Sequence, residues 1–135
     1  MTVLVYDAGA LIAAGRDDRR IWSMHRRAVG RGTQPIVPAT VLAQVRRSPA
    51  QRGLSRLLGG CRLAVLDRHA AELVGDLLGA ADREDVVDAH VVVCCLVFGA
   101  NCVTSDWDDI IHLAETARSD RTGRFGRMRL SVIPV

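Results

Sequence analysis

TVLVYD, residues 2–7, is a short run of β-branched and aromatic residues that stops at an acidic residue. Apolar side chains fall on both faces of this run, which is typical of a central strand in a parallel sheet. Further strands are predicted at residues 34–37, 61–66, 101–104 and 130–135, the last as an edge strand because it contains Pro134. Helical segments alternate with these strands. We therefore predict a three-layer α/β/α sandwich whose parallel sheet has about five strands.

The helical segments are marked by apolar periodicity and by capping residues. Asp17 or Asp18 is predicted to cap a helix that runs from Ile21 to Val29, and Asp82 or Glu84 to begin a long helix that ends at Phe98. Residues 8–14 are read as small residues followed by a short apolar segment. The other predicted helices cover residues 39–47, 51–58, 68–80, with Asp67 as the cap, and 107–117.

The composition indicates one globular domain over residues 1–135, with a net charge of +3. All eighteen basic residues are arginine. The lack of lysine excludes Walker-A ATPases and Schiff-base enzymes, and it makes a two-component receiver domain a poor fit. The four cysteines have no zinc-finger spacing, and no signal peptide or membrane-spanning run is predicted. We expect a cytoplasmic protein with reduced, buried thiols.

Three acidic residues from distant parts of the sequence are predicted to converge. Asp7 and Asp106 each follow a predicted strand by at most two residues, and Asp88 lies early in a helix. In parallel sheets the ligand site lies beyond the carboxyl ends of the strands, which is where these acids fall. Each acid also has a simpler interpretation, since Asp7 and Asp106 could cap helices and Asp88 could complement a helix dipole. The combination favours a functional site.

Several carboxylates in one place suit a hard divalent cation such as Mg²⁺ or Mn²⁺. Without a cation they would repel one another, and some would take up protons. A bound ion relieves that repulsion and can orient a water for attack on a phosphodiester. The acids therefore predict metal-dependent phosphodiester hydrolysis. A phosphatase of the haloacid-dehalogenase type, with Asp7 as nucleophile, is disfavoured because Gly9 stands where a second acid is needed.

The segments VLVYDAGALI, VPATVLAQV, DVVDAHVVV and VTSDWDDI, in this order, resemble the PIN domain and specifically the VapC toxins of bacterial toxin–antitoxin pairs. The resemblance extends from Thr2 to Val135. It implies a PIN-like fold and a Mg²⁺- or Mn²⁺-dependent endoribonuclease that acts on RNA. It also implies a homodimer that a small VapB-like antitoxin silences.

The resemblance assigns the catalytic and metal-binding roles to Asp7, Asp88 and Asp106. Thr104 matches the hydroxyl residue of the T-x-D turn, and Asp109 and Asp85 are secondary acids that could hold the metal, directly or through water. One position departs from the family pattern. The second acid, usually a glutamate, is replaced by Gln44, which brings no charge. A catalytically weakened PIN-fold module that binds RNA or an antitoxin without cleaving is therefore the alternative.

Arginines gather near the end of the chain, and we expect this group to contact RNA phosphates or an acidic antitoxin, or else to be a solvated loop. The group consists of Arg118, Arg121, Arg124, Arg127 and Arg129. A second basic face is expected from Arg46, Arg47, Arg52 and Arg56. His90 and Cys94 have the i, i+4 spacing of a zinc-ligand pair, but no second pair accompanies them and core packing is favoured.

Overall fold

The computed structural model describes residues 2–47, 52–126 and 131–135. Its sheet consists of five parallel strands in the order β3-β2-β1-β4-β5, so the predicted α/β sandwich is confirmed. The strands are β1 (Leu4–Tyr6), β2 (Ile36–Pro38), β3 (Arg62–Ala64), β4 (Asn101–Thr104) and β5 (Val132–Pro134). Each is shorter than the sequence predicts or equal to it, and β5 is an edge strand as expected.

Within the described residues, seven helices connect the strands. They are α1 (Ala8–Gly15), α2 (Arg19–Gly30), α3 (Ala39–Arg46), α4 (Arg52–Leu58), α5 (Arg68–Ala81), α6 (Val86–Phe98) and α7 (Trp107–Ser119). The described residues contain no helix long and apolar enough to cross a membrane.

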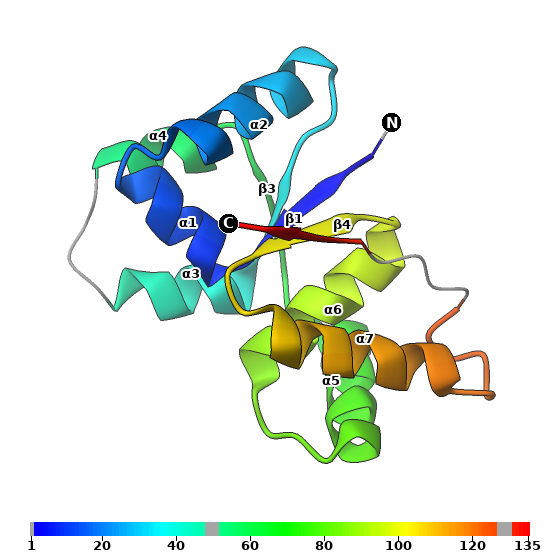
Figure 1. Cartoon of the computed structure of the whole chain (residues 1–135). Helices are drawn as coiled ribbons and strands as arrows, with labels where there is room; N and C mark the ends of the chain where they lie inside the picture. Colours follow the sequence, from blue (N-terminus) through cyan, green and yellow to red (C-terminus); the bar gives the residue numbers. More distant parts are fainter. Residues whose placement is uncertain (1, 48–51, 127–130) are drawn as a thin grey trace.

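The connections place the helices on the two faces of the sheet. The chain passes from β1 to β2 and β3 through α1–α4, and then returns across the sheet to β4 and β5 through α5–α7. Right-handed crossovers in opposite directions along a sheet put these two groups on opposite faces. Figure 1 shows α1, α2 and α4 on one side and α5–α7 on the other. The short helix α3 contacts both α1 and α6, so it joins the two groups.

The core lies between the sheet and helices α1 and α6. Val5 and Tyr6 of β1 and Leu11 of α1 are fully buried. The middle of α6 is buried on all sides from Ala89 to Cys95, as expected of an apolar helix under a parallel sheet. Gly99 ends this helix with a positive φ of 61°, a conformation that glycine adopts without strain.

Two predicted helix boundaries need correction. The long helix begins after Asp85, whose carboxylate accepts a hydrogen bond from the Asp88 backbone N–H at 3.0 Å. The predicted start at Asp82 or Glu84 is wrong, because Asp82 adopts a left-handed conformation and ends α5. Residues 8–14 belong to a true helix, α1. At the other caps, Asp18 and Asp67 bond to backbone N–H groups as expected.

Candidate metal centre

Four acidic residues lie at the carboxyl ends of the central strands. Asp7 follows β1 and Asp106 follows β4, which is paired with β1 in parallel register. Asp88 lies in the first turn of α6, and Asp109 in the first turn of α7. Strand ends and helix starts therefore meet at one edge of the sheet, where helix N-termini carry partial positive charge and favour anions.

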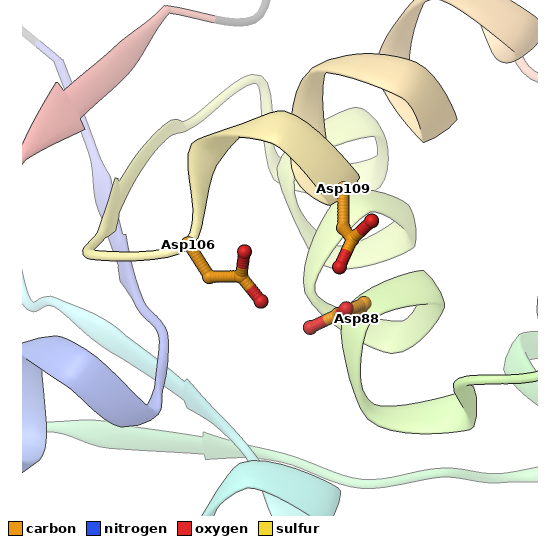
Figure 2. Close-up of side chains that lie close together, drawn as sticks. All are labelled: Asp88, Asp106 and Asp109. Carbon is orange, nitrogen blue, oxygen red and sulfur yellow. The ribbon is translucent and has the colours of Figure 1, made fainter.

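Three of these acids form a compact cluster. Asp88, Asp106 and Asp109 each offer a carboxylate oxygen, and these three oxygens all lie within 4.8 Å of one another. Figure 2 shows their side chains directed into the same space, from α6 below and from the β4–α7 junction above. Asp106 precedes α7, yet its side chain makes no capping hydrogen bond. The helix-cap interpretation of Asp106 is therefore wrong, and its carboxylate is free for a ligand.

Asp7 is bonded more tightly than the cluster acids. It is 4% exposed, and its Oδ1 accepts a hydrogen bond from the Ala8 backbone N–H at 2.7 Å. Its Oδ2 accepts a hydrogen bond from the Thr104 hydroxyl at 2.6 Å. The same hydroxyl oxygen accepts a hydrogen bond from the Asp106 backbone N–H at 2.9 Å. Thr104 thus connects the ends of β1 and β4 and fixes the start of the segment that carries Asp106.

Two of the acids, Asp88 and Asp106, have a raised pKa. Burial, and then the charges of Asp85, Asp7, Asp106 and Asp109, raise the pKa of Asp88 to about 7. The pKa of Asp106 is also raised, by desolvation first and then chiefly by the nearby charge of Asp109. No arginine forms an ion pair with these acids in the part of the chain that the structure describes. A divalent cation would supply the missing positive charge, and the all-oxygen ligands suit Mg²⁺ or Mn²⁺.

Gly9 contributes to this geometry in a way that the sequence analysis missed. A Cβ atom on Gly9 would lie 2.9 Å from the backbone nitrogen of Ser105, which precedes Asp106. Real Cβ atoms do not approach backbone so closely, so a side chain here would push the β4–α7 junction away from α1. The available signal was a glycine among apolar helical residues, which marks a close backbone approach.

The fold is that of a known structure. The chain matches a chain in the crystal structure of VapBC2 from Rickettsia felis bound to a DNA fragment from their promoter, with a TM-score of 0.65 over 98% of this chain and 99% of that chain. This chain has the PIN-domain fold of a VapC protein. The two sequences are 11% identical, so the likeness concerns the fold. No protein-family model matches the sequence, and no curated protein matches it.

Two further predicted residues, Asp85 and Gln44, lie at the start of α6 and on α3. Asp85 is exposed and serves as the N-cap of α6, and its charge acts on Asp88. Gln44 is exposed on α3, one helical turn beyond Thr40. The Thr40 hydroxyl is hydrogen-bonded to Nδ1 of His90 in α6 at 2.8 Å. Residues i and i+4 share a side of a helix, so Gln44 lies on the side of α3 that turns toward α6.

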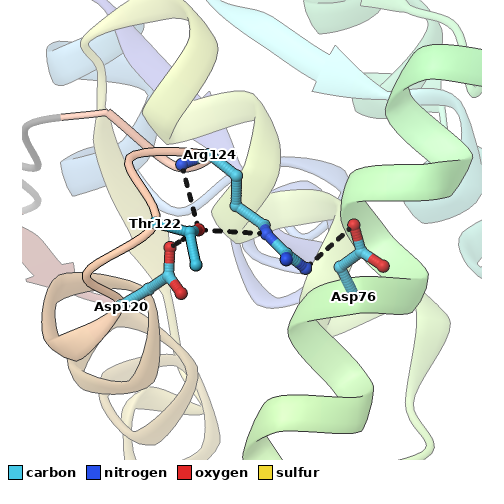
Figure 3. Close-up of polar contacts among 4 residues, drawn as sticks. All are labelled: Asp76, Asp120, Thr122 and Arg124. Carbon is cyan, nitrogen blue, oxygen red and sulfur yellow. Dashed lines mark hydrogen bonds and ion pairs between the residues drawn. The ribbon is translucent and has the colours of Figure 1, made fainter.

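The C-terminal arginines do not form one uniform group. Arg118 and Arg121 are exposed. Arg124 is committed within the protein: its guanidinium pairs with Asp76 of α5 at 3.2 Å and donates to the Thr122 hydroxyl at 3.2 Å. Figure 3 shows this arrangement, in which Thr122 also bonds to Asp120. Arg127 and Arg129, also predicted as contacts, lie outside the described residues.

The proposed zinc pair is better explained as part of the core. His90 is fully buried, and burial lowers its pKa. Cys94 is buried, and burial raises the pKa of its thiol to about 12, so it remains protonated. Zinc binds the thiolate, and no third ligand joins this pair among the described residues.

Proposed function

We propose that this chain is a metal-dependent endoribonuclease that hydrolyses RNA phosphodiester bonds, as the toxin of a toxin–antitoxin pair. One observation carries the proposal: three carboxylates from two helix starts and a strand end have oxygens within 4.8 Å of one another, at the ligand-binding edge of a PIN-like sheet. The raised pKa values of Asp88 and Asp106 are typical of functional sites, where like charges are held close together.

Asp88, Asp106 and Asp109 would hold the divalent ion. A bound Mg²⁺ or Mn²⁺ supplies positive charge to the phosphate oxygens and lowers the pKa of water. The protein positions the ligands in advance, because Thr104 fixes the Asp106 segment and Asp85 caps the helix that carries Asp88. Asp88 must lose its proton before it can act as a ligand, so we expect ion binding to strengthen as the pH rises through about 7.

Asp7 has a different role in this proposal. Its two oxygens already accept hydrogen bonds from Ala8 and Thr104, yet its negative charge acts on both Asp88 and Asp106. A carboxylate oxygen can accept more than one bond. We propose that Asp7 adds charge to the ion site and anchors the Thr104 hydroxyl, with direct contact to the ion through a remaining lone pair or through a water.

The partners are proposed from the fold and the surface. The matched structure is a VapBC2 complex, which supports a VapB-like antitoxin as the partner of this chain. A homodimer is supported by exposed apolar side chains around a cavity next to the edge strand β3: Leu63, Val65 and Val97 are 47%, 61% and 59% exposed and line that cavity. Exposed apolar groups that gather at one place commonly mark protein interfaces.

The test is RNA cleavage with three variants from the same helix start. Asp106→Asn and Asp109→Asn remove cluster carboxylates, whereas Asp108→Asn removes an exposed acid of the same turn that is not part of the cluster. We expect the first two to lower the rate of Mg²⁺- or Mn²⁺-dependent cleavage by about 100-fold or more, and the third by less than about threefold. Equal activity in all three would refute the proposal.

The second candidate is a PIN-fold module that binds RNA or an antitoxin without cleaving. Gln44 favours it, because α3 contributes an uncharged amide where a fourth acid is expected. This candidate predicts RNA binding that weakens steeply with salt, and no cleavage with any divalent ion. Cleavage by the unaltered chain that is lost in Asp106→Asn would eliminate it.

A further inference from the structure

Charge is divided between the two sides of the molecule. Residues 8–66 carry eleven arginines and only two acids, Asp17 and Asp18, whereas residues 67–135 carry seven arginines and twelve acids. The first segment contains α1, α2 and α4, which lie on one side of the sheet, and α3, which contacts both groups of helices, whereas the second contains α5–α7 on the other side (Figure 1). The small net charge of +3 therefore conceals a first segment with a formal charge of +9 and a second with −5.

The arginines of residues 8–56, here called the arginine face, are largely uncompensated. Asp18 uses its carboxylate to cap α2, and Asp17 forms an exposed pair with Arg56 at 3.6 Å. Eight further arginines, from Arg16 to Arg47, are exposed and have no ion pair within residues 2–47, 52–126 and 131–135. Arg62 is not part of this face, because its guanidinium lies 4.8 Å from the centre of the Phe98 ring of α6. Repulsion among like charges on one side disfavours the compact state, and a polyanion would offset it.

The opposite side cannot serve a polyanion equally well. The ion site is bordered there by two exposed acids outside the cluster, Asp85 at the start of α6 and Asp108 in the first turn of α7. Arg124, on the same side, is neutralised by Asp76. A phosphate chain that reaches the ion site would therefore meet repulsion along α6 and α7 and attraction along α1–α4.

Helix α3 connects the arginine face to the ion site. Its first turn is held to α6 by the Thr40–His90 hydrogen bond, two residues beyond Asp88. The helix then continues to Arg46, six residues and about 9 Å along its axis. Arg46 and Arg47 are exposed at its end, with no ion pair in the described structure.

We infer that the RNA strand enters the ion site from one side only, with its flanking phosphates on the arginine face and along α3. The inference rests on the proposed RNA substrate and adds the direction from which it approaches. It assigns the main RNA-binding role to Arg46 and Arg47 rather than to Arg118 and Arg121. Each bound phosphate releases counterions, so the arginine face also determines the salt dependence of binding.

The experiment compares two charge reversals at helix ends. The first double variant is Arg46→Glu/Arg47→Glu, at the end of α3. The second is Arg118→Glu/Arg121→Glu, at the end of α7. Both changes are therefore made near a helix C-terminus, where the effect of the helix dipole is similar. All four residues are exposed. Binding to a fluorescent single-stranded RNA of about a dozen nucleotides is measured by anisotropy at several salt concentrations. Ca²⁺ replaces Mg²⁺ so that the strand stays intact.

The first pair should weaken RNA binding by about tenfold or more and lower the slope of log affinity against log salt by about 1.4, and the second should weaken it by less than about threefold. Equal effects of the two pairs, or no effect of the first, would overturn the inference. Binding of poly-glutamate but not of RNA to the arginine face would also overturn the inference, since the partner would then be an acidic protein. If cleavage fails but the first pair still controls RNA binding, the proposed hydrolysis is wrong and the direction of approach stands.

Discussion

The β1–α1 and β4–α7 junctions look alike in sequence and differ in structure. Each places an aspartate between a buried strand and a helix, and the two strands are neighbours in the sheet. Asp7 is buried, and both of its oxygens are hydrogen-bonded within the protein. Asp106 is exposed and makes no capping bond. The same local pattern therefore produces one acid that holds the structure together and one that is free for a ligand.

The difference between Asp7 and Asp106 arises from the hydrogen bonds of Thr104 and from how deeply each aspartate is buried. The Thr104 hydroxyl donates to Asp7 and accepts from the Asp106 backbone, so it satisfies one carboxylate and leaves the other free. Stability and ion binding are thereby separated between two acids of one site. Substitutions at the two junctions should affect these properties in different proportions.

The largest expected contrast is between Asp7→Ala and Asp106→Ala. Asp7→Ala leaves the buried Thr104 hydroxyl and the Ala8 N–H without their acceptor, so we expect the free energy of unfolding to fall by about 2 kcal/mol. Asp106→Ala removes an exposed, repulsive carboxylate, and the free energy of unfolding should change by less than about 0.5 kcal/mol. Urea unfolding without metal measures both.

For ion binding we expect the opposite order, with Asp106→Ala affected more than Asp7→Ala. Asp106 belongs to the acid cluster that we propose as the ion site, so Asp106→Ala should abolish Mn²⁺ binding by calorimetry, although we expect the variant to fold. A destabilised Asp106→Ala together with an unaltered Asp7→Ala would contradict the division between the junctions.

Thr104→Val tests the connection between the junctions with a side chain of nearly the same shape. It leaves one oxygen of Asp7 and the Asp106 N–H without a partner, in a place where Thr104 is fully buried. We expect a loss of about 1–2 kcal/mol in the free energy of unfolding, together with weaker Mn²⁺ binding. Thr104→Ser restores the hydroxyl and should recover most of the Mn²⁺ affinity. Failure of serine to do so would show that the methyl group matters more than the bond.

The pH dependence of the free energy of unfolding tests the titration of Asp88 in the acid cluster. The pKa of Asp88 is about 7 in the folded chain and 3.8 as its ordinary value, so the folded state binds the proton more tightly. The contribution of Asp88 to the free energy of unfolding is fully present below about pH 4 and is lost as the pH rises toward 7. After allowance for solvent screening of a half-exposed carboxyl, the loss is about 1 kcal/mol. Urea unfolding of the metal-free chain from pH 4 to 8 measures it.

Asp88→Asn is the control for this titration. Burial lowers the pKa values of His25 and His90, and these groups make stability rise with pH in an overlapping range. The difference between the unaltered chain and the variant isolates the contribution of Asp88. That difference should fall with rising pH in the absence of metal, and its dependence on pH should vanish when saturating Mg²⁺ displaces the proton. A difference independent of pH would show that Asp88 is not crowded by the other acids.

Much of the fold was predictable because the strands are short and apolar on both faces and the helices are separated by turn residues. The caps at Asp18 and Asp67 were predicted from local sequence, because a cap depends on the next three residues. The start of α6 was predicted at Asp82 or Glu84, whereas the structure has Asp85 as its cap, within the four residues from Asp82 to Asp85. Three of these are acidic, and only the turn geometry selects Asp85.

The convergence of the acids was predictable from topology, and their ranking was not. Asp109 joins the compact cluster, although the sequence places it below Asp7, Asp88 and Asp106 as a metal ligand. Asp7 was predicted as a ligand together with Asp88 and Asp106, but its hydrogen bonds depend on Thr104, which is 97 residues away. Side-chain rotations across such separations are determined by tertiary packing. Neither periodicity nor spacing carries that information.

The smallest expected effect concerns Gln44, an exposed residue of α3. Gln44→Glu supplies the absent fourth carboxylate and should tighten Mn²⁺ binding by about threefold to tenfold in calorimetry at pH 8, where Asp88 is largely deprotonated. Ala43→Glu adds the same charge to the exposed neighbour on another side of α3, so it serves as the matched control. A general electrostatic effect would appear in both variants, whereas coordination by residue 44 would appear only in the first. Equal affinities for the two variants would show that the α3 side chain does not reach the ion, and that the site consists only of the acids at the two junctions and at α6.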